Sequence, residues 1–433
     1  MITKKRRKCQ KFVMERYGNM EIKREFYLNE LIDRMDNGLI KIVTGIRRCG
    51  KSYLLDPIFK DYLIEQGIEE DHIIKLSLDE RQNRKYLDPD ELDKYVRDLI
   101  IDDNKYYLIL DEIQEVKDFE SVLIGFMHIK NIEIYVTGSN SKFLSSDIVT
   151  EFRGRGDEIR VYPLSFSEFF SAYDGTEEKA LNEYYTYGGL PLTLLAKTDN
   201  AKTNYLKTQK DNVYINDIIE RNNVKNKEEL EMLVQIIASD IGSLTNPLKL
   251  SNHFKERDSN TTMTDKTIYN YLGYLQDSFM IERARRFDVR GKKFIDTPQK
   301  YYFTDLGIRN SFLDFRQSEE ISHTMENVIY LELRKRGYNV DVGTVEIREG
   351  NIKKQLEIDF VATKGNNKIY IQSALEMKTP EKVAQEQKSL INVNDFFKKI
   401  IIVGDNVKKS RYDNGIILMS IYDFLLDSNS LEY

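Results

Sequence analysis

Residues 45–52 read GIRRCGKS and fit the pattern G-x-x-x-x-G-K-[ST], and no other stretch constrains this chain as strongly. The run before them, residues 39–44, is apolar and β-branched, and the residues after them continue as a helix start. This strand, loop and helix order is the context in which a phosphate-binding P-loop works. The glycines would let backbone N–H groups surround a phosphate at the positive end of the helix dipole. A chance match is the alternative, and the surrounding strand and helix favour the P-loop.

The residue types inside this loop predict ATP and Mg²⁺ as its ligands. Lys51 would contact the β- and γ-phosphates, and the Ser52 hydroxyl would bind Mg²⁺. We expect the loop to line the nucleotide through Gly45, Ile46, Arg47, Arg48, Cys49, Gly50, Lys51, Ser52 and Tyr53.

An acidic motif follows the P-loop along the chain. Residues 106–112 read YYLILDE, which is an apolar strand that ends in two acids and matches the Walker B pattern. Asp111 would bind Mg²⁺ through water, and Glu112 would orient and activate the attacking water. Two solvated acids at a strand end are the alternative, and the upstream P-loop favours the magnesium site.

A third strand, residues 133–137, precedes polar residues that could sense the γ-phosphate, and the candidates are Asn140 and Ser139. A short helix should follow and end near two arginines. Arg155 is the first choice, and Arg153 the second, for an arginine that stabilises transition-state charge in a neighbouring subunit. That role requires a homo-oligomer. Two solvated arginines at a helix end, favoured by the helix dipole, are the alternative.

Taken together, these blocks resemble the AAA+ superfamily, and specifically a prokaryotic ATPase family. Its members have a P-loop domain, a winged helix and a restriction-endonuclease-like C-terminal domain. The resemblance implies ATP hydrolysis with Mg²⁺, and it rests on residues 45–52, 106–116, 135–148, 152–170 and 187–191.

The middle of the chain predicts a winged helix. Helices are expected at residues 227–239, 247–255 and 265–278, with a two-stranded wing over residues 280–303. The third helix would read double-stranded DNA through Lys266, Asn270 and Tyr274. The wing is rich in basic residues that suit phosphate contact, namely Arg283, Arg285, Arg286, Arg290, Lys292, Lys293 and Lys300. Winged helices also bind proteins, so a protein partner is the alternative.

From about residue 325, the order of helices and strands resembles the PD-(D/E)XK nuclease fold. Asp359, Gln372 and Glu326 fit the positions that hold a divalent metal in that fold. The lysine that should follow Gln372 is replaced by Ala374, and Lys378 lies further along the chain. We therefore expect a degenerate nuclease fold kept for binding or packing, with a metal-dependent nuclease as the alternative.

Composition supports a multidomain α/β protein of the cytoplasm. The chain has 433 residues, a formal net charge of −6, and two cysteines, which exclude a disulfide framework. No stretch approaches the roughly 18 apolar residues of a membrane span. We expect a parallel-sheet AAA+ core with a helical lid, in this order: a basic arm at 1–19, the ATPase core at 20–163, the lid at 164–225, the winged helix at 226–310 and the nuclease-like domain at 311–433.

Three hypotheses for function follow from these observations. The first is a Mg²⁺-dependent ATPase that is coupled to DNA or partner binding. The second is a DNA-binding regulator that ATP switches and that turns over slowly. The third is an ATP-gated, metal-dependent DNA nuclease, which the missing lysine disfavours.

Overall fold

The computed structural model describes residues 22–138, 154–316, 321–350 and 352–432. The chain forms two compact units. The first comprises the residues up to Leu164 together with Leu190–Leu195, and the second comprises Ser165–Gly189 and the residues from Ala196 onward. Within the described part of the chain, no helix is long and apolar enough to cross a membrane.

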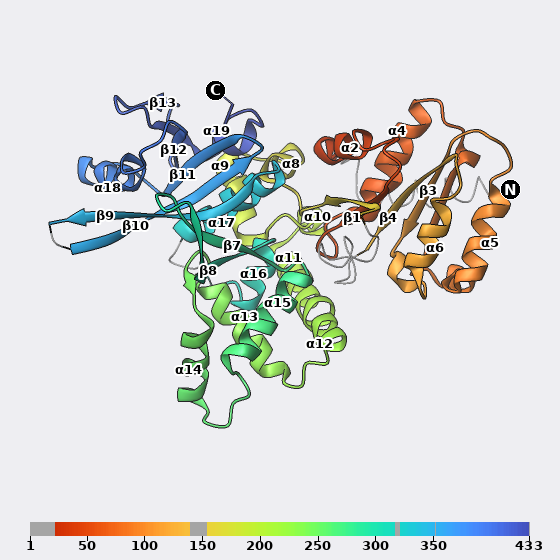
Figure 1. Ribbon diagram of the computed structural model, residues 1–433, viewed down its shortest axis with the longest axis horizontal. Coiled ribbons are helices and arrows are strands. Elements are labelled where there is room, and N and C mark those ends of the chain that lie inside the picture. The colour runs from red at the N-terminus through yellow and green to blue at the C-terminus, as the bar shows by residue number, and fades with distance from the viewer. Residues whose placement is uncertain (1–21, 139–153, 317–320, 351, 433) are drawn as a thin grey trace. The chain divides into compact units, whose positions relative to one another are not determined.

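The first unit is built on a parallel sheet with the strand order β2-β3-β4-β1-β5 (Figure 1). The described strands of this sheet are β1 (Ile40–Thr44), β2 (Ile73–Ser77), β3 (Tyr106–Asp111), β4 (Ile132–Thr137) and β5 (Gly156–Arg160). The expected α/β core with a parallel sheet is therefore confirmed. Since β4 lies between β1 and β3, the carboxyl ends of these three strands meet at one edge of the sheet.

Helices cover this sheet on both faces. Alternate strand residues such as Ile42 and Leu108 pack with Leu92 of α5 (Pro89–Leu99) and Leu123 of α6 (Phe119–Phe126) in one core. Figure 1 shows α5 and α6 side by side on this face. On the opposite face lie α2 (Glu25–Ile32), α4 (Lys60–Glu65) and η1 (Leu54–Phe59). The ring centroid of Phe59 in η1 lies 4.6 Å from that of Tyr135.

The helix after the P-loop is interrupted. Its first turn, α3 (Lys51–Tyr53), runs into a π-helical stretch, η1 (Leu54–Phe59), before α4 begins. Asp56 has non-helical angles, φ −147° and ψ 112°. The cause is Pro57, because proline lacks an N–H and excludes the residue before it from the helical region.

The second unit combines many helices with one mixed sheet. From Ser165 to Gly189 it contributes α8 (Phe166–Ser171) and α9 (Glu177–Tyr187), whereas the short α10 (Pro191–Leu195) belongs to the first unit. The helices that follow are α11 (Asp199–Gln209), α12 (Asn216–Asn222), α13 (Lys227–Ser239), α14 (Pro247–Arg257), α15 (Asp265–Asp277), α16 (Leu306–Phe312), α17 (Ile321–Lys335), α18 (Pro380–Ile391) and α19 (Ile421–Leu426). The three helices and two strands expected between residues 227 and 303 are thus present.

The sheet of the second unit has the order β13-β14-β12-β11-β10-β9-β7-β8-β6. Its strands are β6 (Leu244–Thr245), β7 (Ile281–Asp288), β8 (Lys293–Phe303), β9 (Asn339–Glu349), β10 (Ile352–Lys364), β11 (Asn367–Ala374), β12 (Lys398–Val403), β13 (Ser410–Arg411) and β14 (Ile417–Ser420). The expected wing is the β7–β8 hairpin, and β7 pairs in parallel with β9 at Arg286 and Val342. One sheet therefore runs through the regions expected to be a winged helix and a nuclease-like domain (Figure 1). The identities of these two regions remain predictions.

Candidate nucleotide site at the P-loop

The P-loop depends on its glycines. Gly45 has φ 144° and Gly50 has φ 100°, in the region that side chains rarely adopt. A Cβ atom added to Gly45 would lie 2.1 Å from the carbonyl oxygen of Val161. The backbone of the loop therefore packs directly against the residue that follows β5. A P-loop needs such a tight bend so that its backbone N–H groups can surround a phosphate.

Lys51 is held inside this loop. Its side chain is 5 % exposed, and Nζ donates to the carbonyl oxygens of Gly45 at 2.9 Å and Ile46 at 3.3 Å. A positive charge is thus fixed within the curve of the loop. This placement fits the predicted contact with the β- and γ-phosphates.

Arg24 supports the loop from outside, and no sequence pattern predicts this role. The buried guanidinium donates to the carbonyl oxygens of Cys49 at 3.1 Å and Tyr162 at 2.7 Å. The same guanidinium lies 4.6 Å from the ring centroid of Tyr27. Arg24 thereby ties the P-loop to the segment that follows β5. Only contacts far apart along the chain produce this arrangement, so no local pattern could have predicted it.

The two predicted magnesium ligands lie together. Ser52 Oγ donates to Asp111 Oδ1 at 3.0 Å. Burial raises the pKa of Asp111, while hydrogen bonds from Thr137 and Ser52 act in the opposite direction. A hydroxyl and a carboxylate are the hard oxygen ligands that Mg²⁺ prefers, so the side chains present fit this ion.

Thr137 is a further residue of the site that the sequence did not reveal. It is the last residue of β4, is fully buried, and donates its hydroxyl proton to Asp111. The same hydroxyl accepts from the backbone N–H of Glu112 at 2.9 Å. Thr137 therefore fixes the positions of both Walker B acids. A polar residue at the carboxyl end of a central strand was the available signal.

Glu112 follows Asp111 directly and has a left-handed backbone, with φ 56°. Its half-buried carboxylate accepts a hydrogen bond from the side-chain amide of Gln114. The Glu112 charge lies near enough to Asp111 to help raise the pKa of that carboxyl. Its role as a water-activating base stays a prediction.

Of the remaining predicted residues, Asn140, together with Ser139 and Arg153, lies outside the described residues. Arg155 is exposed and comes just before β5, where its carbonyl accepts from the Ile40 N–H at 2.9 Å. Ile40 opens β1 and Thr44 closes it, a rise of about 13 Å along the strand. Arg155 thus lies at the amino end of β1, whereas the P-loop follows the carboxyl end of that strand.

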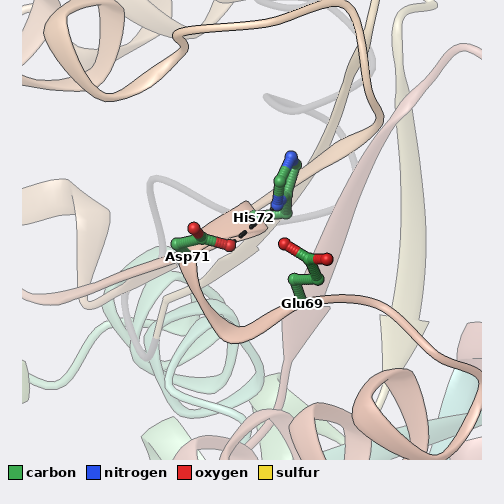
Figure 2. A group of neighbouring side chains, drawn as sticks. All are labelled: Glu69, Asp71 and His72. Atoms are coloured by element: carbon green, nitrogen blue, oxygen red, sulfur yellow. Dashed lines mark hydrogen bonds and ion pairs between the residues drawn. The ribbon is translucent and has the colours of Figure 1, made fainter.

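A separate group of ligand-type side chains is formed by Glu69, Asp71 and His72 (Figure 2). The His72 ring already uses both nitrogens, because Nδ1 lies 2.9 Å from Asp71 and Nε2 lies 3.2 Å from Asp102. The hydrogen bond to Asp71, with the help of Asp102, raises the pKa of His72. This group therefore favours a protonated imidazole, which is not a metal ligand.

The predicted nuclease-like residues lie in the second unit and have protein partners. Glu326 accepts from Lys300 Nζ at 2.9 Å and from Tyr302, and Asp359 accepts from the Ser373 N–H at 2.7 Å. Among the described residues, the group in Figure 2 is the one set of three or more acids, histidines or cysteines close enough to share a metal ion.

Gln372, the third predicted member, accepts from the Ser389 hydroxyl at 3.3 Å. Burial, together with the nearby Glu326 charge, raises the pKa of Asp359 to about 7. Lys300 supplies the positive charge among these acids. Besides Glu326, it contacts Glu357 at 2.7 Å. The expectation that Lys300 contacts DNA phosphate from the wing is wrong, since the side chain is buried and its charge is neutralised inside the unit.

Other wing arginines are also engaged within the second unit. Arg290 donates to the carbonyl oxygens of Glu346 at 2.8 Å and Asn392 at 3.0 Å, and Arg285 pairs with Asp341 at 3.4 Å. The ion pair with Asp341 neutralises the charge of Arg285, whereas the carbonyl oxygens orient Arg290 and leave its charge in place.

On the predicted reading helix, α15, the side chains of Lys266 and Asn270 are exposed and that of Tyr274 is half-buried. The face of this helix that carries them is thus open to a partner.

Comparison with known proteins agrees with this geometry. Residues 37–170 match the family model of an AAA domain, and residues 178–319 match a domain of unknown function, DUF8612. An uncharacterized protein of Haemophilus influenzae is 33% identical over 411 residues, which is 94% of this chain and 98% of that protein. The chain belongs to the family of this Haemophilus protein, and its first unit carries an AAA domain.

A second relative, uncharacterized protein MJ1544 of Methanocaldococcus jannaschii, is 31% identical over 359 residues, covering 79% of this chain and 76% of the relative. Among solved structures, the Walker-type ATPase PABY2304 of Pyrococcus abyssi is similar, with a TM-score of 0.48 and 16% identity over 68% of this chain and 96% of that one. The AAA domain includes the P-loop, the Walker B acids and all of β1 to β5.

Proposed function

We propose that this AAA protein binds Mg²⁺-ATP at the P-loop, hydrolyses it, and couples the nucleotide state to DNA or partner binding by the second unit. The observation that carries the proposal is the hydrogen bond of 3.0 Å between Ser52 and Asp111, which are 59 residues apart in the chain. It brings the P-loop and the Walker B strand to one point, as a magnesium site between them requires.

In this proposal, the backbone of the P-loop and the Lys51 ammonium hold the β- and γ-phosphates. Ser52 and Asp111 would hold Mg²⁺, which neutralises phosphate charge when bound. Glu112 positions the attacking water and accepts its proton, and Asn140 contacts the γ-phosphate. Thr137 acts through these acids, because its hydroxyl holds the Asp111 carboxylate and the Glu112 backbone.

Arg155 would complete the site of a neighbouring subunit. Arg155 lies at the amino end of β1, whereas the P-loop follows the carboxyl end. This position supports a role in trans, and such a role makes the active form a homo-oligomer.

Double-stranded DNA is the proposed partner of the second unit, through α15. Lys266 and Asn270 are exposed on this helix, and an exposed lysine and amide suit contacts with phosphates and base edges. We do not propose nuclease activity, because Glu326 and Asp359 are engaged by Lys300 and Ser373.

The experiment is steady-state ATP hydrolysis with and without duplex DNA, for the native protein, Glu112→Gln and Lys266→Ala. Matched controls are Glu115→Gln, an exposed acid on the same turn, and Lys249→Ala, an exposed lysine on α14. We expect duplex DNA to stimulate ATP hydrolysis by the native protein. Glu112→Gln should abolish hydrolysis, and Lys266→Ala should weaken the stimulation by DNA.

Other outcomes of this experiment separate the hypotheses. Hydrolysis indifferent to DNA would replace DNA by a protein partner. Tight ATP binding without any turnover in the native protein would contradict the ATPase and favour the ATP-switched regulator.

A further inference from the structure

An open cavity with a volume of about 870 Å³ lies in the second unit, and none of the site residues assigned above lines it. It is found where β11 and β12 begin, at the pairing of Ile369 with Lys398. The basic side chains that line it are Lys364, Lys368, Lys398, Lys399 and Arg411, against two acids, Asp395 and Glu432. The cavity therefore carries an excess of positive charge.

This charge is not neutralised by ion pairs. Within the described part of the chain, none of the five basic side chains pairs with a carboxylate. Lys364, Lys398 and Lys399 donate instead to carbonyl oxygens of the backbone, at 2.7, 2.6 and 2.8 Å respectively. Asp395 accepts instead from the hydroxyl of Tyr370 at 2.6 Å, and the five basic groups still outnumber Asp395 and Glu432. The lysines are thus oriented by the protein while their charges remain available.

The basic groups also repel one another. Burial, together with the neighbouring Lys409 and Arg411, lowers the pKa of Lys398. A bound anion would relieve this repulsion, as it does wherever like charges converge on a ligand.

Two phenylalanines stand at the rim. Phe396 is fully exposed and Phe397 is 40% exposed, and the Lys368 ammonium lies 5.0 Å from the ring centroid of Phe397. A fully exposed phenylalanine gains nothing from burial in this unit. Basic groups that line a groove, with aromatic rings beside them, are the combination by which proteins hold phosphates and stack bases.

We propose that this cavity binds single-stranded nucleic acid. Phosphates lie against the lysines and Arg411, and a base stacks on Phe396. A single strand fits better than a duplex, because duplex bases already stack on one another and offer no free face to an aromatic ring. The cavity shares no lining residue with α15 or the P-loop, so the proposal goes beyond the proposed ATPase and its duplex partner.

The test is fluorescence anisotropy of a labelled oligothymidine of about 12 nucleotides, a length within known site sizes. It is made without ATP, so the result does not depend on hydrolysis. We expect Phe396→Ala to weaken binding about 5- to 100-fold, as the loss of one stacked base does. For Arg411→Glu we expect weaker binding and a slope of log affinity against log salt that is smaller by about 0.7 or more.

Matched controls are Ile391→Ala, an exposed apolar residue at the end of α18, and Lys353→Glu, an exposed lysine of β10. Both should bind like the native protein. Tripolyphosphate, which carries the same charge chemistry without bases, serves as competitor and should displace the oligonucleotide poorly at equal phosphate concentration.

Three results would overturn the proposal. In the first, Phe396→Ala and Arg411→Glu bind as tightly as the controls. In the second, tripolyphosphate competes as well as the oligonucleotide, which makes the cavity a phosphate site. In the third, Lys266→Ala loses binding while Arg411→Glu does not, which assigns the nucleic acid to α15.

Discussion

Replacing Thr137 with valine keeps the shape of a buried side chain and removes only a hydroxyl that two groups of the nucleotide site use. The hydroxyl donates to Asp111 and accepts from the Glu112 N–H at 2.9 Å. A hydrogen bond to a charged group contributes about 1.5–3 kcal/mol, and an unpaired buried donor costs about 1–3 kcal/mol. Because one hydroxyl makes both contacts, the two do not simply add. We expect the free energy of unfolding to fall by about 2–4 kcal/mol.

Urea denaturation followed by circular dichroism measures this loss for the transition of the first unit. Thr137→Ser is the matched control, because it keeps the hydroxyl and loses a methyl group, at a cost of about 0.5–1.5 kcal/mol. A valine variant at least as stable as the serine variant would refute the hydrogen-bond account.

The same substitution should weaken magnesium binding. The Thr137 hydrogen bond opposes the burial that raises the pKa of Asp111, so its removal raises that pKa further. Protons then compete more strongly with Mg²⁺, and Thr137→Val should need more Mg²⁺ for ATP hydrolysis, most clearly at the acidic end of the pH range. Equal Mg²⁺ dependence in both proteins would contradict this role.

Three further predictions concern other buried or paired groups. Burial raises the pKa of Asp111, so the charged carboxylate destabilises the ligand-free fold at pH values above 7. In that pH range Asp111→Asn should raise the urea concentration at the midpoint of unfolding, and a lower midpoint would be evidence against this. The same variant should lose Mg²⁺-dependent hydrolysis. A pKa of about 7 for Asp359 means that folding favours its protonated form, so stability falls as pH rises. Asp359→Asn should remove about 2–3 kcal/mol of that fall between about pH 5 and about pH 8, as measured by urea denaturation. Because the pKa of His72 is raised, mainly by Asp71, its stabilising effect is present below about pH 6.5 and is lost as pH rises through the raised value. NMR titration of His72 should show a lower pKa in Asp71→Asn, and an unchanged one would disprove the assignment.

The P-loop and the Walker B acids were predictable because each is a local pattern attached to a strand. Parallel strands place such patterns at one edge of a sheet, so Ser52 and Asp111 could be expected to meet. Thr137 was harder to predict, because the last residue of a buried strand belongs equally well to the core, and only its hydrogen bond to Asp111 assigns it to the site. Arg24 was beyond prediction, since its partners, Cys49 and Tyr162, lie in two distant segments.

Lys300 shows why the second unit was harder to predict. The basic residues around it predict a solvated wing residue. It lies two residues before Tyr302, and side chains two apart in a strand share a face, so both reach Glu326. That face is buried because α17 packs against it, with the Tyr330 ring stacked 4.2 Å from that of Tyr302. The sequence pattern of the hairpin contains no sign of this packing.

Equilibrium binding of a fluorescent ATP analogue, titrated with Mg²⁺, tests the central claim most directly. The native protein should bind the nucleotide more tightly as Mg²⁺ is added. Ser52→Ala should need a Mg²⁺ concentration at least about tenfold higher than the native protein needs, because it lacks a hydroxyl at the metal site. Ser121→Ala, an exposed serine on α6, is the control and should behave like the native protein. Affinity that is indifferent to Mg²⁺, or unchanged in Ser52→Ala, would contradict a magnesium nucleotide site between the P-loop and Asp111.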